Sequence, residues 1–268
     1  MLFAHGFGCD QSMWRFITPS FEKDYRVVLL DYVGCGKSDV KAYDAERYST
    51  LEGYAKDILE VCEALELTHV IFVGHSVSSM IGVLAANEQP QRFSHLIMLG
   101  PSPCYVNDGD YVGGFEREDI AGLLDTMERN FLGWAQFLAP LAMKNSDRPG
   151  LAQELEESFC STDPDIMRRF AEATFLSDVR AHLPKVRVPS LILQCAEDTI
   201  APACVGSYLQ QNLPGSTLRI MKATGHCPHL SHPEETIQLM AEYLAASDSA
   251  ACPTSQDRAS VASTTSEG

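Results

Sequence analysis

Six short apolar runs recur along the chain, with little alternation between apolar and polar residues inside them. They are "LFA" (2–4), "RVVLLD" (26–31), "HVIFVG" (69–74), "HLIMLG" (95–100), "SLILQC" (190–195) and "TLRIMK" (217–222). Runs of this length between turn residues are typical of strands buried on both faces, and the longer helical patterns that separate them are typical of crossovers. The pattern predicts an α/β fold built on a mostly parallel sheet of about six strands.

The regular succession of strands stops between residues 101 and 189, where no strand candidate occurs. Helical patterns follow each other there at 115–143, 150–160 and 164–178, punctuated by Pro140, Pro149 and Pro164. Proline favours the start of a helix or ends one, so several separate helices are expected. We interpret residues 101–189 as a helical lid inserted between two strands of a core formed by residues 1–100 and 190–246.

The composition changes after residue 246. Residues 247–268 read "SDSAACPTSQDRASVASTTSEG", which is rich in Ser, Thr and Ala and nearly free of large apolar side chains. Such a segment buries too little apolar surface to offset the entropy lost on ordering. We expect this tail to be disordered.

Charge and composition exclude several classes of partner. Aspartate and glutamate outnumber lysine and arginine by 36 to 20, and a formal charge of −16 disfavours nucleic acid and anionic lipid. Apolar residues make up 45% of the chain, yet no apolar run is long enough to span a membrane. The nine cysteines form no Cys-x-x-Cys pair and no signal peptide is recognised, so we expect reduced, buried thiols in a cytoplasmic protein.

The stretch "GHSVSSMIG" (74–82) follows a strand candidate directly and opens a helical pattern. A strand-to-helix turn this tight exposes its central serine, Ser76, in front of the helix N-terminus, as a nucleophile requires. The pattern Gly-x-Ser-x-Gly expects glycine where Ser78 stands, and we expect the extra hydroxyl to bond within the first helical turn. A helix cap in a nucleotide-binding protein is the alternative, but the glycine pattern of a phosphate loop is missing.

A serine hydroxyl is a weak nucleophile and needs a base that is itself oriented by a carboxylate. The chain order serine, acid, histidine is the one used where a serine follows a strand in this way. The segment "AEDTIAP" places Asp198 just beyond the end of a strand candidate. We therefore predict Asp198 as the acid and expect the adjacent Glu197 to point elsewhere.

The segment "TGHCPHLSHP" follows the last strand candidate and contains three histidines. His226 stands next to a glycine at the strand exit, whereas His229 and His232 fall toward the next helix. A metal site is the alternative for three neighbouring histidines, but no carboxylate or thiol pattern accompanies them. We predict His226 as the base and expect neither metal nor cofactor.

The sequence "HGFG" (5–8) follows the first strand candidate. Attack on an acyl carbon creates an oxyanion, which backbone amides at such a turn stabilise. We predict the amides of Phe7 and Val77 as the two donors; a plain turn is the alternative for this sequence.

These residues resemble those of the α/β-hydrolases similar to the bacterial stress-response regulator RsbQ and to the plant strigolactone and karrikin receptors. The matching stretches include "FAHGFGCDQSMW", "DYVGCGKSD", "GHSVSSMIG", "ILQCAEDTIAP" and "TGHCPHLSHPEETI", and they span nearly the whole chain to about residue 245. Serine at position 78, in place of the second glycine of Gly-x-Ser-x-Gly, resembles a trait of this group. The closest likeness is to RsbQ, through "CSTDP" and "GHCPHLSHP".

The resemblance implies an α/β-hydrolase fold with a V-shaped lid of four helices over an apolar pocket. The pocket residues it implies, each of which could equally be a packing residue of the core, are Phe7, Val77, Trp134, Leu138, Phe159 and Phe175. The family begins with two strands that are missing here ahead of "HGFG", so the resemblance implies that residues 26–31 lie at a sheet edge.

The function implied by the resemblance is that of a serine hydrolase which binds and slowly hydrolyses a small apolar ester or lactone, such as a butenolide. A signalling protein would then be the partner that recognises ligand binding and hydrolysis. The alternatives are a metabolic carboxylesterase or lactonase without such a partner, and a silent interaction module, which the intact triad residues argue against.

Overall fold

The computed structural model of the protein describes residues 1–251. All six predicted strands are present, and they form one parallel sheet in the order β2-β1-β3-β4-β5-β6. Their bounds are β1 (Leu2–Ala4), β2 (Val28–Leu30), β3 (Val70–His75), β4 (Phe93–Leu99), β5 (Ser190–Glu197) and β6 (Ser216–Thr224). The short strand β2 lies at one edge of this sheet, as the resemblance implies.

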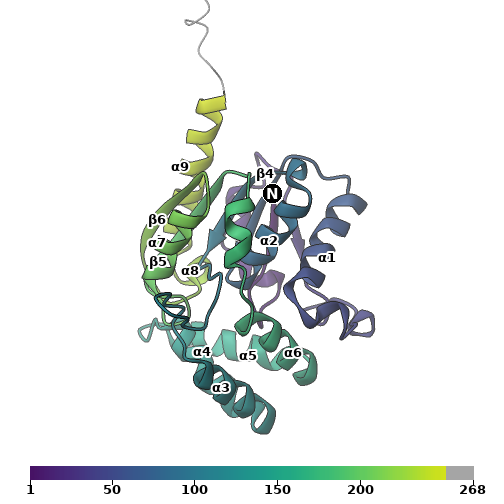
Figure 1. Cartoon of the computed structure of the whole chain (residues 1–268), viewed down its shortest axis with the longest axis vertical. Helices are drawn as coiled ribbons and strands as arrows, with labels where there is room; N and C mark the ends of the chain where they lie inside the picture. The colour runs from purple at the N-terminus through teal and green to yellow at the C-terminus, as the bar shows by residue number, and fades with distance from the viewer. Residues whose placement is uncertain (252–268) are drawn as a thin grey trace, which may run out of the picture.

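Helices cover both faces of the sheet (Figure 1). They are α1 (Leu51–Ala64), α2 (Val77–Glu88), α7 (Ala203–Asn212), α8 (Pro228–Ser231) and α9 (Pro233–Ala251). Short 3₁₀ helices occur in the connections, at η1 (Gln11–Trp14), η2 (Thr18–Ser20), η3 (Val40–Ala42), η4 (Arg47–Ser49), η5 (Pro90–Arg92) and η6 (Arg180–Lys185). No helix in residues 1–251 combines the length and apolar character needed to cross a membrane.

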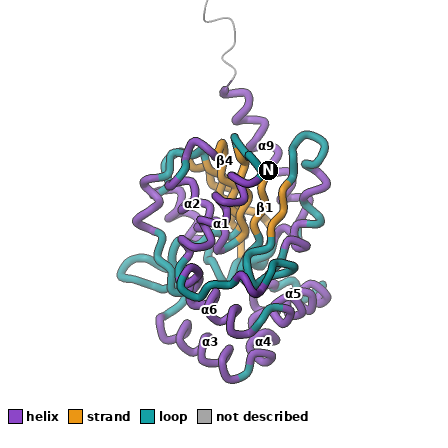
Figure 2. Tube along the Cα trace, turned by 90° about the vertical axis from the view of Figure 1, so that its right-hand side faces the viewer, coloured by secondary structure: helices purple, strands orange, loops and turns teal. Residues whose placement is uncertain are grey.

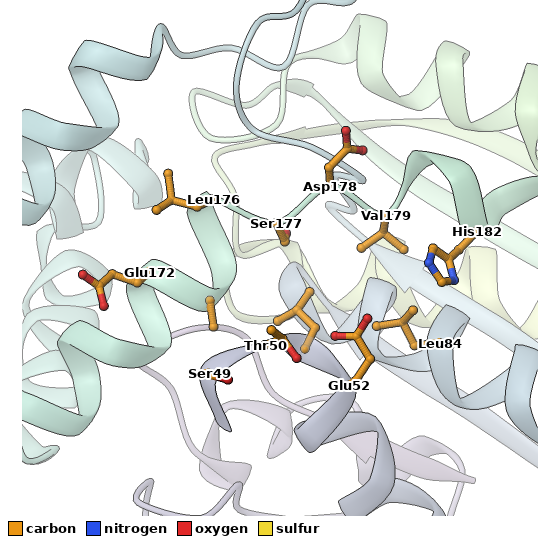
Figure 3. A pocket seen from close by; sticks show the side chains of 12 residues that line it. Ser49, Thr50, Glu52, Leu84, Glu172, Leu176, Ser177, Asp178, Val179 and His182 are labelled. Carbon is orange, nitrogen blue, oxygen red and sulfur yellow. The ribbon is translucent and has the colours of Figure 1, made fainter. Parts of the chain in front are cut away.

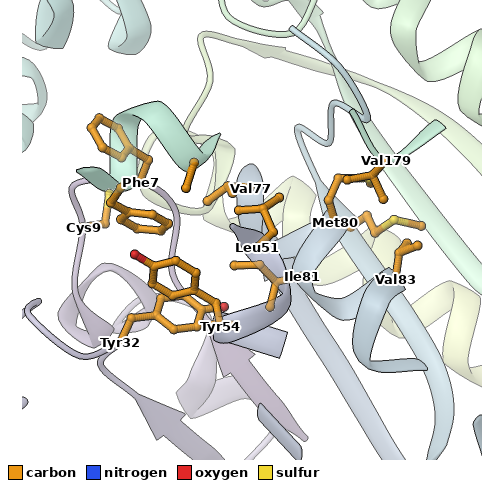
Figure 4. Packing of buried hydrophobic residues seen from close by; sticks show 14 of the residues in the cluster. Phe7, Cys9, Tyr32, Leu51, Tyr54, Val77, Met80, Ile81, Val83 and Val179 are labelled. Atoms are coloured by element: carbon orange, nitrogen blue, oxygen red, sulfur yellow. The ribbon is translucent and has the colours of Figure 1, made fainter. Parts of the chain in front are cut away.

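Successive strand residues enter two separate hydrophobic cores. Phe72 and Met98 pack in a core shared with α1, α2 and α7, and Figure 4 shows Ile81 of α2 beside Leu51 of α1 in this layer. Val73 packs on the opposite face, with side chains of η1 and α9. The strands β1, β3, β4 and β5 are largely buried on both faces, so their apolar runs have no polar alternation. The outer strand β6 differs from this expectation, since Arg219, Ile220 and Lys222 are exposed while Met221 and Ala223 are buried.

Four helices form a layer beyond the sheet, below it in Figure 2. They are α3 (Arg117–Arg129), α4 (Phe131–Met143), α5 (Pro149–Ser161) and α6 (Pro164–Phe175). The helical pattern predicted for 115–143 is divided at Asn130, whose φ of −152° is not helical and whose side chain accepts from the Gly133 amide at 3.0 Å. Pro140 lies inside α4 and does not end it there.

The last helix extends past the predicted end of the core. α9 ends at Ala251, so its final turn belongs to the segment 247–268 for which we expected disorder. Ser247 still donates its hydroxyl to the Tyr243 carbonyl at 2.9 Å. The remainder of the predicted tail, residues 252–268, lies outside the described residues.

Candidate active site

Four loops meet where the parallel strands end at their carboxyl termini, beside the helices α4 to α6. Residues 5–8 follow β1, Ser76 follows β3, Asp198 follows β5 and His226 follows β6. All four loops lie at the same end of the sheet, where the strands have their carboxyl termini, because neighbouring strands run in parallel. The sheet therefore brings together residues that lie far apart in the sequence.

Ser76 sits in a sharp turn between β3 and α2. Its φ of 56° and ψ of −123° are strained for a residue with a side chain, and such geometry costs on the order of 1–3 kcal/mol. The preceding strand passes so close to α2 that a Cβ placed at Gly74 would lie 2.7 Å from the backbone carbonyl carbon of Ser78. Glycine at position 74 is thus required by the approach of strand and helix.

Ser78 has partners other than those expected. We predicted a bond within the first turn of the helix, and this was wrong: the hydroxyl donates to the carbonyl of His5, at the end of β1. Since that hydroxyl's proton is used, the Tyr32 hydroxyl is the donor in the 2.8 Å bond to Ser78 Oγ. The serine therefore ties α2 to two distant segments, which glycine at this position could not do.

Hydrogen bonds connect Asp198, His226 and Ser76 in a chain. His226 Nδ1 lies 2.7 Å from Asp198 Oδ2, and His226 Nε2 lies 2.7 Å from Ser76 Oγ. All three residues are buried. An ionised carboxylate only accepts, so Nδ1 carries the proton, and Nε2 of the neutral ring is free to accept from Ser76.

The carboxylate of Asp198 is held from its other side by backbone amides. Asp198 Oδ1 accepts from the amides of Ile200 at 2.8 Å and Ala201 at 3.1 Å. The neighbouring Glu197 points elsewhere, as expected, and pairs with Lys144 at 2.9 Å on the surface. These bonds direct the Asp198 carboxylate toward the histidine.

The loop that carries His226 is fastened to the lid and to β3. The His226 amide donates to the Ala142 carbonyl at 2.7 Å, and a Cβ at Gly225 would lie 2.2 Å from the Met143 carbonyl oxygen. On the other side, His75 Nε2 donates to the His226 carbonyl at 2.8 Å. The backbone of the histidine is thus fixed independently of its ring.

Two further histidines lie behind His226. The ring centroid of His75 is 4.4 Å from that of His229, and the His229 centroid is 4.7 Å from that of Trp14. Burial lowers the pKa of His75 well below its usual value and lowers the pKa of His229 to about 3. Both rings are therefore neutral near pH 7. Within residues 1–251, no three histidine, cysteine or acidic side chains are grouped so that they could hold a metal ion.

The predicted oxyanion donors, Phe7 and Val77, belong to two segments next to Ser76. Val77 is the first residue of α2, so its amide is one of those that a helix leaves without an internal partner. Phe7 follows β1 in the turn that faces this end of the sheet, and its ring lines the cavity at Ser76. Both amides belong to elements that the sheet positions beside Ser76.

Tyr105 was not among the predicted site residues. Its hydroxyl lies 3.3 Å from Ser76 Oγ, and burial raises the pKa of this phenol. It belongs to the segment after β4, which the sequence assigned to the lid. The only sequence signal for Tyr105 is that it follows β4, the strand next to β3, which directly precedes Ser76.

A small cavity of about 30 Å³ opens at Ser76. Its lining comes from the core loops and from α4, α5 and α6, and consists of Phe7, Cys9, His75, Ser76, Leu138, Ala142, Leu155, Phe159, Thr174, Phe175, Ile200, His226 and Cys227. Four of the predicted pocket residues, Phe7, Leu138, Phe159 and Phe175, are in this lining. Trp134 packs behind it, with its ring centroid 5.1 Å from that of Phe159.

A larger cavity, of about 450 Å³, lies elsewhere, between the start of α1 and the end of α6 (Figure 3). Its two serines, Ser49 and Ser177, each donate to a backbone carbonyl at 2.7 Å and not to a base. None of its lining residues belongs to the hydrogen-bonded chain at Ser76. Volume alone therefore does not identify the reactive site.

Comparison with known families agrees with this architecture. A family model described as "Alpha/beta hydrolase family" matches residues 1–239. The chain belongs to the alpha/beta hydrolase family.

Relatives of this hydrolase include proteins named as receptors and esterases. Karrikin insensitive 2 receptor CA of Petunia hybrida is 40% identical over 245 residues, covering 91% of each protein. Strigolactone esterase D14 of Arabidopsis thaliana is 41% identical over 241 residues, covering 90% of each. Strigolactone esterase RMS3 of Pisum sativum is 40% identical over 235 residues, covering 87% of this chain and 88% of that protein.

A solved hydrolase from Oleispira antarctica has the same fold. It superposes with a TM-score of 0.88 at 47% identity, covering 90% of this chain and 89% of that one. The family and the fold of the chain are thus established together.

Proposed function

We propose that this alpha/beta hydrolase is a serine hydrolase that binds and slowly hydrolyses a small apolar ester or lactone, such as a butenolide, in a signalling or stress-response role. One observation carries the proposal: the hydrogen-bonded chain from Asp198 through His226 to Ser76 ends in a small cavity that is lined mainly by apolar side chains. Relatives at about 40% identity that are named strigolactone esterases and karrikin receptors support the ligand class.

The geometry supports acyl transfer through the serine. Ser76 Oγ attacks the acyl carbon and its proton passes to His226 Nε2, while Asp198 stabilises the imidazolium that forms. The amides of Phe7 and Val77 would donate to the oxyanion. His226 then returns the proton to the leaving alkoxide, the acyl group stays on Ser76, and a water molecule activated by the same histidine releases it.

The lid, residues 101–189, supports slow turnover. A cavity of about 30 Å³ holds about two water molecules, so a ligand can enter only if the helices that carry Leu138, Phe159 and Phe175 move. Opening and closing then precede and follow each reaction, and such steps limit the turnover of many enzymes. The same movement would present a changed lid surface to a signalling protein.

Three finer features belong to the proposal. The motifs "CSTDP" (160–164) and "GHCPHLSHP" (225–233) support a position close to RsbQ within the family.

A signalling protein is the proposed partner, since it would bind the lid surface that changes when a ligand enters. The eight cysteines in residues 1–251 are all free thiols, which supports a reducing, cytoplasmic location.

The test is incubation with a butenolide probe, followed by intact-protein mass spectrometry and measurement of product. We expect product release and a covalent acyl adduct on Ser76. Ser76→Ala should abolish hydrolysis but keep probe affinity within about tenfold, because the hydroxyl matters mainly in the transition state. Ser79→Ala removes a neighbouring buried hydroxyl, which donates to the Gly74 carbonyl, and should still react.

The outcomes separate the candidate functions. If the wild type shows neither hydrolysis nor an adduct, the assignment as a hydrolase is overturned. High turnover on simple esters without accumulation of an adduct would favour a metabolic carboxylesterase or lactonase instead of a slow receptor-like enzyme. Equal loss of binding and rate in Ser76→Ala would contradict the role given to the serine.

A further inference from the structure

The cavity at Ser76 contains polar groups that the proposed reaction does not use. Apart from Ser76 and His226, its polar lining consists of His75, Thr174 and two thiols. Two atoms of these side chains have no hydrogen-bond partner among the described residues: His75 Nδ1 and Thr174 Oγ1. An unpartnered polar atom in a ligand cavity is a candidate for ligand recognition.

His75 and the thiols do not fit this role. A Cβ built on Gly6 would lie 2.4 Å from His75 Nδ1, so this nitrogen packs against the backbone of the first loop. Burial raises the pKa of both Cys9 and Cys227, which keeps the thiols neutral, and a neutral thiol is a weak donor. Thr174 is the polar group that remains.

Thr174 belongs to the last turn of the lid helix α6 and is 1% exposed. A threonine inside a helix usually donates its hydroxyl to the carbonyl one turn earlier, but this one has no partner in residues 1–251. A buried hydroxyl without a partner is unfavourable, so a bound atom that pairs with it is favoured. Its neighbour Phe175 contacts Phe7 and Tyr105, and both Thr174 and Phe175 line the cavity at Ser76.

We propose that Thr174 is a specificity-determining residue, whose hydroxyl binds a second, uncharged oxygen atom in the acyl part of the substrate. The inference rests on the proposed hydrolase function and names the substrate class more narrowly. Thr174 and Ser76 line the same small cavity, so an acyl group bound at Ser76 lies beside the wall that carries Thr174. An acyl group with an ether or keto oxygen there satisfies the hydroxyl, whereas a hydrocarbon of the same size leaves it unpartnered.

The test compares two p-nitrophenyl esters with acyl groups of equal size, the methoxyacetate and the butyrate, which differ by an ether oxygen in place of a methylene. The measured quantity is the ratio of their kcat/KM values. Thr174→Val keeps the shape and removes the hydroxyl, and should lower this ratio about fivefold to tenfold, the worth of one neutral hydrogen bond. The higher intrinsic reactivity of the methoxyacetate cancels in the comparison of variants.

Two variants serve as controls. Thr174→Ser keeps the hydroxyl and should hold the ratio within about twofold of the wild type. Ser177→Ala removes the hydroxyl that donates to the Thr174 carbonyl. Ser177 lines the larger cavity and not the one at Ser76, so this variant should also leave the ratio unchanged. Thermal unfolding of Thr174→Val at or above the wild-type Tm shows that the variant is folded.

The failures are distinguishable. If wild type and Thr174→Val cleave both esters with the same ratio, the hydrolase function stands and the role of Thr174 is wrong. If the wild type cleaves neither ester, the proposed function falls and this inference falls with it. A ratio lowered equally in Thr174→Ser would trace the effect to packing and would also overturn the inference.

Discussion

Replacing His229 with phenylalanine should reduce the acid sensitivity of the fold. His229 is fully buried, and neither of its ring nitrogens has a partner among the described residues. Burial lowers its pKa from 6.5 to about 3, so the folded protein keeps the ring neutral where the unfolded chain would protonate it. Phenylalanine keeps an aromatic ring against Trp14 and has no proton to bind.

The sign and size of the effect follow from this difference in pKa. Below pH 6.5 the unfolded state binds a proton that the folded state does not, so the free energy of unfolding falls as the pH falls, until the folded ring titrates at about 3. Each pH unit is worth about 1.4 kcal/mol, which amounts to about 2 kcal/mol between pH 7 and pH 5. His75 adds a loss in the same direction, but it is present in both proteins.

Urea unfolding followed by circular dichroism at pH 7 and pH 5 measures how much free energy of unfolding the wild type and His229→Phe each lose over this interval. We expect the wild type to lose about 2 kcal/mol more than His229→Phe over this interval. Any change in packing from the larger ring cancels, because it affects the variant equally at both pH values. Between pH 7.5 and 8.5 the difference between the proteins should stay constant, and this is the internal control. Equal losses from pH 7 to pH 5 would refute the buried, neutral state of His229.

Two further substitutions test the site and its support. Asp198→Asn should leave the circular dichroism spectrum unchanged but lower ester turnover by about 10⁴-fold, since His226 loses the partner that sets its tautomer; unchanged turnover would move the role to another carboxylate. Ser78→Gly restores the glycine of the usual motif but removes the partner of the Tyr32 hydroxyl and of the His5 carbonyl. It should lower the free energy of unfolding by about 1–3 kcal/mol, and an unchanged Tm would show that these bonds contribute nothing.

The architecture could be predicted from local sequence patterns because parallel strands buried on both faces leave a direct trace. Each of the six apolar runs became a strand, and the region without such runs became the helices α3 to α6. Asp198 and His226 were recognisable as candidates because each stands just beyond a strand end. Parallel strands bring such positions to one end of the sheet, where His226 bonds to Ser76 and Asp198 bonds to His226.

Only the tertiary structure decided which side chains meet across long distances in the sequence. Ser78 bonds to the His5 carbonyl, 73 residues away, where local reasoning expected a partner in its own helical turn. Trp134 packs behind Phe159 and not in the cavity lining, while Tyr105 reaches Ser76 from a loop that the sequence could not orient. Periodicity over a few residues determines which face of an element is buried. Which of the buried residues face a cavity, and which hydroxyl there lacks a partner, depends on how separate elements pack together.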